Sequence, residues 1–124
     1  MTTTFDHEKP EVYKKSRAFI TWLEPLLQKM PKSSPIHDQL ERAGVSIALT
    51  LAEGNGKFTG ADRCRFFDNS GGSALECAAA LEVPTAKGRC EPAEISGKER
   101  LLEIVSMLVG LIKANSDYRL HEGD

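Results

Sequence analysis

The sequence lacks several features that define common protein classes. Its three cysteines, Cys64, Cys77 and Cys90, form no CxxC or CxxH pattern, so no zinc site is expected, and their odd number suits a reducing compartment. No charged-then-apolar signal sequence opens the chain, and no apolar run approaches the roughly 18 residues that a membrane span needs. These absences predict a cytoplasmic protein that has no membrane partner.

Aromatic residues and net charge are also low. Aromatics make up 6% of the 124 residues, and the hydrophobic 40% consists mostly of Leu, Ile and Ala, which favours helices over strands. The formal net charge of −2 and the pI near 5.9 argue against a strongly basic nucleic-acid binder. A chain of this length fits a single domain, residues 1–124, with one modest core.

Apolar residues recur at helical spacing in four segments. These segments are residues 10–30, 35–54, 60–83 and 92–114. Because the connections between them are short, neighbouring helices should run antiparallel. The sequence therefore predicts an all-α protein, an up-down-up-down antiparallel four-helix bundle, with loose polar ends at residues 1–8 and 116–124.

Proline and hydroxyl residues mark the expected helix ends. Ser34 is the natural cap of the second helix, and Thr59 should cap the third, with Asp62 three residues later near the positive helix end. Pro25 lies inside the apolar pattern of the first helix, so we expect one helix with a bend. The pair Val83–Pro84 is expected to end the third helix.

The second and third segments carry unusual surfaces. Val45, Leu49 and Ala52 form an apolar stripe beside the main one, which predicts that the second helix is buried on two sides. The third segment contains Asn-Ser-Gly-Gly-Ser at residues 69–73, and each glycine should weaken a helix by about 1 kcal/mol relative to alanine. Either this run breaks the helix, or it keeps a continuous helix smooth so that another helix can lie close. We favour close approach.

The corner between these helices, Gly-Asn-Gly-Lys-Phe-Thr at residues 54–59, superficially resembles a phosphate-binding loop. A P-loop requires Gly at the position of Leu51 and Ser or Thr at that of Phe58, and it follows a strand. Nucleotide binding through this loop is therefore not expected.

Three cationic residues, Lys57, Arg63 and Arg65, gather around the start of the third helix. Such residues can contact a phosphate backbone, and such an interaction strengthens when several copies align them. The alternative is a solvated helix entrance whose charge is balanced by Asp62 and Asp68, and this alternative is favoured for a monomer.

Glu53 and Glu76 lie among apolar or small residues, where paired carboxylates can perform acid–base or metal chemistry. A di-iron bundle needs Glu-x-x-His pairs, and no His lies three residues after any Glu. We therefore expect structural or interface roles for both residues, with no catalytic residue, no metal and no cofactor. Cys77 is expected to be a small core residue.

A wider set of residues resembles a known family. The matching features are Ala52-Glu53-Gly54, Lys57 and Thr59, Arg65-Phe66-Phe67, and Gly72-Ser73 followed by Glu76 and Leu81. They resemble the small bacterial four-helix bundle family whose members include proteins encoded in intervening sequences of large-subunit ribosomal RNA genes. The accessory variability determinant of diversity-generating retroelements is a relative.

This resemblance implies a left-handed up-and-down bundle that assembles as a ring, a homopentamer, without enzymatic activity. For the retroelement relative it also implies a basic ring that binds nucleic acid and a reverse transcriptase. The negative net charge of this chain departs from that pattern.

The first hypothesis is therefore a non-catalytic oligomeric scaffold or interaction protein whose main partner is itself. The residues Glu53, Gly54, Gly71, Gly72, Ser73 and Glu76 would then serve structure or interface. The alternative is a ring that binds RNA or an RNA-associated protein through Lys57, Arg63 and Arg65.

Overall fold

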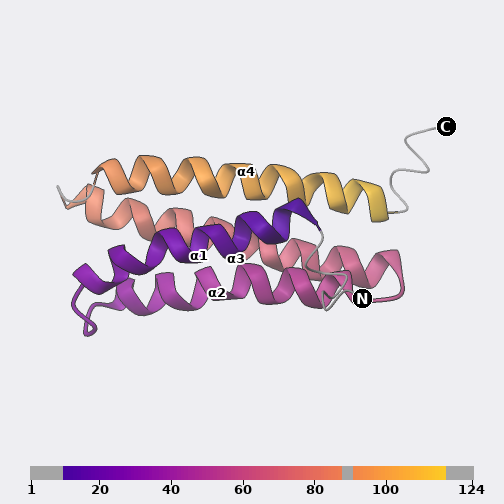
Figure 1. The fold of residues 1–124 in the computed structure, drawn as a ribbon, viewed down its shortest axis with the longest axis horizontal. Coiled ribbons are helices and arrows are strands. Elements are labelled where there is room, and N and C mark those ends of the chain that lie inside the picture. The colour runs from indigo at the N-terminus through magenta and orange to yellow at the C-terminus, as the bar shows by residue number, and fades with distance from the viewer. Residues whose placement is uncertain (1–9, 88–90, 117–124) are drawn as a thin grey trace, which may run out of the picture.

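The computed structural model describes residues 10–87 and 91–116. Within these ranges the chain forms four helices and no strand. They are α1 (Glu11–Lys29), α2 (Pro35–Asn55), α3 (Gly60–Ala86) and α4 (Glu91–Asn115). Figure 1 shows the helices lying along a common long axis, with each running opposite to the one before it. The predicted all-α four-helix bundle is confirmed.

Each helix packs against two neighbours. The contacting pairs are α1–α2, α2–α3, α3–α4 and α1–α4, and the described helices make no contact across either diagonal. The contacts that α3 makes with α2 and α4 are the most extensive. At 19 residues α1 is the shortest helix, whereas α3 has 27. The interfaces of α3 are thus the largest in the bundle.

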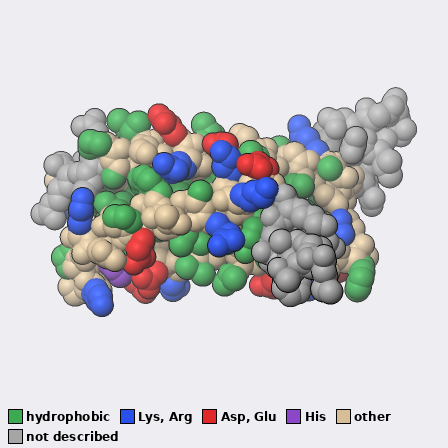
Figure 2. All heavy atoms as spheres, in the orientation of Figure 1, with side chains coloured by type: hydrophobic (Ala, Val, Ile, Leu, Met, Phe, Trp, Pro, Cys, Tyr) green, Lys and Arg blue, Asp and Glu red, His purple; other side chains and the backbone are tan. Residues whose placement is uncertain are grey.

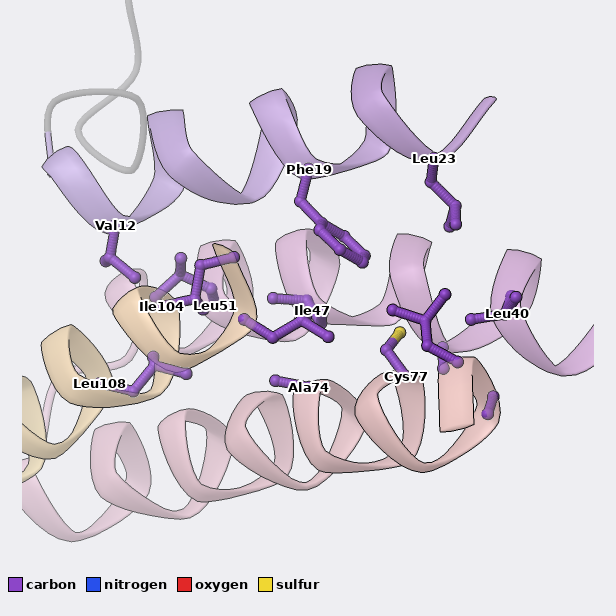
Figure 3. Packing of buried hydrophobic residues seen from close by; sticks show 14 of the residues in the cluster. Val12, Phe19, Leu23, Leu40, Ile47, Leu51, Ala74, Cys77, Ile104 and Leu108 are labelled. Atoms are coloured by element: carbon purple, nitrogen blue, oxygen red, sulfur yellow. The ribbon is translucent and has the colours of Figure 1, made fainter. Parts of the chain in front are cut away.

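All four helices contribute side chains to one hydrophobic core, part of which Figure 3 shows. Phe19 from α1, Ile47 from α2 and Ile104 from α4 are fully buried. The inner side of α3 supplies smaller side chains. These are Ala74, Cys77 and Ala80, with Phe67 and Leu81 at either end. Small residues on α3 let α2 and α4 approach it closely.

Hydroxyl groups cap two helices as the sequence predicts. Ser34 Oγ accepts a hydrogen bond from the backbone N–H of Ile36 at 3.3 Å. Thr59 Oγ1 accepts one from the backbone N–H of Asp62 at 3.1 Å. Each bond satisfies one of the amide groups that a helix start leaves without an intrahelical partner.

Two prolines, Pro25 in α1 and Pro84 in α3, lie inside their helices and do not end them. α1 continues across Pro25, as predicted, and the bend expected there stays a prediction. The prediction that Val83–Pro84 ends α3 is wrong, because the helix continues to Ala86. The backbone N–H of Lys87 still bonds to the carbonyls of Val83 and Pro84, at 3.2 and 3.1 Å. A proline in the last turn removes one N–H donor, and the carbonyls around it remain available.

The α3 helix is also continuous through residues 69–73, so close approach, not a break, explains part of this run. Buried Ser70 donates a hydrogen bond to the carbonyl of Ile47 in α2 at 2.7 Å, and Ser73 donates to Ser46 Oγ at 2.9 Å. The two glycines between these serines lie away from α2. A Cβ atom added at Gly71 or Gly72 would meet nothing within 4 Å.

Within one chain the predicted two-sided burial of α2 is wrong. Val45 and Leu49 are 40% and 58% exposed. The reason is geometric, because α2 has only α1 and α3 as neighbours and this second apolar stripe faces neither.

Candidate interaction surfaces

An apolar groove runs along the outer side of α3 and α4. It encloses about 300 Å³, and its lining residues are Ala74, Leu75, Ala78, Lys98, Glu99, Leu101, Leu102 and Val105. Leu75 and Leu102 are 64% and 67% exposed, which is high for leucines on well-packed helices. Gly71 and Gly72 precede Leu75 by four and three residues, so they extend the same side of α3. The name α3–α4 face is used below for Gly71, Gly72, Leu75, Ala78, Leu102 and Val105.

One of the two charged residues that line this groove, Lys98, is held in an ion pair. Lys98 Nζ lies 3.0 Å from Glu82 Oε1, which joins α4 to α3. The hydrogen bond and the negative charge of Glu82 raise the pKa of Lys98 above its usual range. The ammonium therefore remains charged and engaged at neutral pH, and the groove between the helices is left mainly apolar.

A second exposed surface lies on α2. Its residues are Glu41, Arg42, Val45, Ser46, Leu49, Thr50 and Glu53, and they are called the α2 face below. Two apolar side chains, Val45 and Leu49, form its centre, and charged residues border them. Arg42 pairs with Asp38 at 3.2 Å in an exposed ion pair. The two faces thus differ in chemistry, since the α2 face has a charged rim and the α3–α4 face a small-residue apolar groove.

Of the three predicted cationic residues, Arg63 makes hydrogen bonds that hold the fold together. Arg63 Nε donates to the carbonyl of Lys57 at 2.7 Å, and its Nη1 donates to Asn115 Oδ1 at 3.4 Å. Cys64 Sγ donates to the carbonyl of Ile112 at 3.4 Å. Arg63 and Cys64 therefore fasten the start of α3 to the end of α4, and the Arg63 guanidinium is engaged mainly in structural hydrogen bonds.

Lys57 and Arg65 are brought together by an aromatic ring. Lys57 Nζ lies 4.8 Å from the centre of the Phe66 ring, and Arg65 Cζ lies 5.5 Å from it. Arg65 also pairs with Asp62 at 3.5 Å, with both side chains well exposed. Both cations are therefore held at the ring by cation–π attraction, and Lys57 is partly exposed while Arg65 is exposed.

Phe58 is a residue that the sequence reasoning missed. It stands between Lys57 and the Thr59 cap, and its side chain is 100% exposed. In the sequence, Phe58 was considered only as the residue that occupies the position of the P-loop Ser or Thr. A large aromatic residue on the short connection between two helices is the signal that could have identified it. The basic corner, defined here as Lys57, Phe58, Arg63, Arg65 and Phe66, thus contains an aromatic side chain with no covering group.

The two predicted carboxylates do not form a pair. Glu53 and Glu76 are both exposed, and Glu76 accepts a hydrogen bond from Gln39 near the start of α2. Gln39 and Glu53 are separated by about 21 Å along α2 at 1.5 Å per residue. Glu76 thus links α3 to α2, while Glu53 belongs to the charged rim of the α2 face.

Of the four remaining predicted structural residues, Gly54 and Ser73 lie at interfaces between helices. A Cβ atom at Gly54 would lie 2.8 Å from Phe66 Cβ, so only glycine lets α2 end this close to α3. Ser73 bonds to α2, as described above. At Gly71 and Gly72, in contrast, an added Cβ atom would contact nothing in the chain.

The described part of the chain disperses the side chains that can ligate a metal and buries one thiol, that of Cys77. No group of three or more His, Cys, Asp or Glu residues there is arranged to hold a metal ion. Burial, with a smaller contribution from the charge of Glu76, raises the pKa of Cys77 to about 12. Its thiol is therefore protonated and inert at neutral pH, and the prediction that Cys77 is a small core residue is confirmed.

The surface is mixed in charge. Figure 2 shows Lys and Arg side chains interspersed with Asp and Glu side chains on one face, with hydrophobic groups between them. Among the described helices, none combines the length and the apolarity that crossing a bilayer requires.

Comparison with known proteins identifies a family and a fold. The family model for the 23S rRNA-intervening sequence protein matches residues 8–110. A crystal structure of a protein of unknown function from the S23 ribosomal protein family of Bacteroides thetaiotaomicron superimposes with a TM-score of 0.74. It is 23% identical in sequence, and the match covers 82% of this chain and 98% of that one. No curated protein matches the chain. The structural likeness shows a shared fold.

Proposed function

The chain belongs to the 23S rRNA-intervening sequence protein family, and from that premise we propose that it is a non-catalytic oligomeric scaffold or interaction protein of the cytoplasm. One observation carries this proposal. The α3–α4 face leaves Leu75 and Leu102 more than 60% exposed next to two glycines at which an added Cβ atom would meet nothing within 4 Å. A contiguous apolar groove on a soluble chain marks an interaction site, and small residues allow a partner helix to lie close.

The second apolar surface bears on the symmetry of the assembly. A twofold dimer buries the same patch of both copies, whereas two different patches on one chain suit a head-to-tail contact. The α2 face supplies the second patch, with Val45 and Leu49 exposed at its centre. Head-to-tail contacts close into a ring when the rotation between copies permits it. We take the homopentamer from the family resemblance as the number of copies.

The test is the mass of the assembly in solution. Native mass spectrometry and light scattering at micromolar concentration should give five chains for the wild type. Leu102→Glu places a charge in the groove, so it should release monomers that keep their helical content. The matched control, Ala18→Glu, adds the same charge to an exposed position on α1 and should leave the mass unchanged. A wild-type protein that is monomeric at these concentrations would refute the proposal.

A second candidate function, binding of RNA or of an RNA-associated protein, is favoured by one feature of the basic corner. Lys57 has no carboxylate partner among the described residues, and Arg65 has only the exposed Asp62. Repetition of these cations around a ring would multiply the number of phosphates that one assembly neutralises. The slope of log affinity against log salt should fall by about 0.7 for each single-strand phosphate that the variants Lys57→Ala and Arg65→Ala no longer neutralise.

A further inference from the structure

The basic corner combines an uncovered aromatic ring with two cations, the partly exposed Lys57 and the exposed Arg65. Phe58 is completely exposed, and it follows Lys57 directly in the chain. Lys57 and Arg65 both rest against Phe66, within 4.8 and 5.5 Å of its ring centre. Phe66 is half-buried and occupied by these cations, so of the two rings only Phe58 presents uncovered faces.

The connection that carries Phe58 is held in place. The Lys57 amide bonds to the carbonyl of Gly54 at 3.1 Å, and the Lys57 carbonyl accepts from Arg63 Nε at 2.7 Å. On the other side of Phe58, Thr59 caps α3 through the amide of Asp62. Both neighbours of Phe58 are therefore fixed by hydrogen bonds. Binding of a partner that covers its ring would cost little entropy for ordering the backbone.

This chemistry fits a ligand with flat rings and negative charges at short intervals. Stacking of bases on aromatic side chains, together with a cationic surface that follows the backbone, is how proteins bind single-stranded nucleic acids. A closed duplex has its bases already stacked on one another, so it could use the cations and not the Phe58 ring. The exposed ring therefore distinguishes single strands from duplexes.

We propose that the basic corner is a binding site for single-stranded RNA, in which a base stacks on Phe58 while adjacent phosphates contact Lys57 and Arg65. This inference rests on the RNA-binding candidate function and adds the form of the RNA and the residue that recognises it. Because every base has a π face, the site accepts many sequences. Arg63 is a positioning residue here, since its guanidinium holds the backbone of Lys57.

The experiment measures fluorescence anisotropy of a labelled 12-nucleotide oligouridine and of an RNA duplex of equal length at 50 mM salt. Phe58→Ala should weaken binding of the single strand about tenfold and leave binding of the duplex unchanged. Phe58→Tyr, which keeps the ring, should retain wild-type affinity. Lys57→Gln should weaken binding of both RNAs, because phosphates are common to both.

Two matched controls isolate the corner. Ile95→Ala removes another exposed apolar side chain, and Lys14→Gln removes another exposed cation; neither should change the affinity for the single strand. Light scattering on each variant verifies that its assembly is unchanged.

Several results would overturn the inference. If the Lys57 variant weakens binding and the Phe58 variants do not, RNA binding survives as an electrostatic function, and the stacking site is refuted. If the wild type binds no RNA at 50 mM salt, both ideas fail. If Phe58→Ala dissociates the assembly, or if vesicles of anionic lipid remove RNA from the wild type and not from Phe58→Ala, Phe58 belongs to a protein or membrane contact instead.

Discussion

The two sides of α3 carry similar small residues and have opposite surroundings. On the inner side, Ser70 and Ser73 meet α2 and donate hydrogen bonds to Ile47 and Ser46. On the outer side, Gly71 and Gly72 have nothing within 4 Å of the place where a side chain would begin. Small residues therefore indicate where a helix can be approached closely, and they do not identify the approaching partner.

The largest expected effect comes from filling the inner side. Ser70→Leu inserts a bulky group at a fully buried position and removes the hydrogen bond to the Ile47 carbonyl. Overpacking of this kind costs about 3 kcal/mol of the free energy of unfolding. Urea unfolding at one fixed protein concentration measures it, because assembly shifts apparent stability.

The matched control places the same leucine at the preceding residue, Asn69. Asn69 is exposed, so Asn69→Leu should alter the free energy of unfolding by no more than about 0.5 kcal/mol. Equal stabilities of the two leucine variants would show that α2 does not pack on this side of α3 as described.

The second prediction tests whether the inner side of α3 is dry. Burial raises the pKa of Cys77 from its ordinary 9.0 to about 12. Above pH 9 the unfolded chain therefore loses a thiol proton that the folded chain keeps. The unfolded state then binds fewer protons, and stability falls as pH rises, by up to about 1.4 kcal/mol per pH unit between pH 9 and 12. Below pH 9 this contribution is fully present.

Chemical unfolding at pH 8, 9 and 10 measures this loss. Cys77→Ala removes the titrating group, so its stability should decline less steeply than that of the wild type over this range. Parallel curves for the two proteins would mean that the Cys77 thiol is accessible to water.

Much of this fold could be predicted from local patterns. Helical spacing located all four helices, and the hydroxyl groups of Ser34 and Thr59 identified two helix starts, because each signal lies within a few residues of the structure that it specifies. The helix end predicted at Pro84 was wrong, because the residue pattern at the proline does not by itself decide where the helix stops. Helix continuation depends there on hydrogen bonds that residues beyond the proline still make.

The candidate sites were less predictable, because they depend on contacts between distant segments. Clustering in sequence grouped Arg63 with Lys57 and Arg65, and only the contact with Asn115 of α4 shows that Arg63 serves the fold. Apolarity identified Leu49 as a residue to be covered, yet within one chain it is 58% exposed. The sequence pattern shows which helix surfaces are apolar. The arrangement of the helices decides which of these apolar surfaces remain exposed in a single chain.

The smallest predicted effect concerns the outer side of α3, where the comparison between the two sides is tested most directly. Gly72→Ala adds a methyl group that meets nothing in its own chain, and alanine favours a helix over glycine by about 1 kcal/mol. The isolated chain should therefore become more stable by about this amount, measured by urea unfolding in the monomeric Leu102→Glu background.

The same methyl group should act in the opposite direction if another copy approaches α3 through Gly72. In the wild-type background the methyl group would then stand between two helices and weaken association. On dilution, light scattering would show that the Gly72→Ala assembly begins to dissociate at a higher protein concentration than the wild-type assembly. Gly97→Ala is the control for a glycine that its own chain already covers, since its Cβ would lie 2.5 Å from Leu81 Cδ1 and should destabilise the chain itself. Stabilisation of the chain by Gly72→Ala with association unchanged would mean that the outer glycines face water in the assembly, and the contact between copies would then lie elsewhere on the bundle.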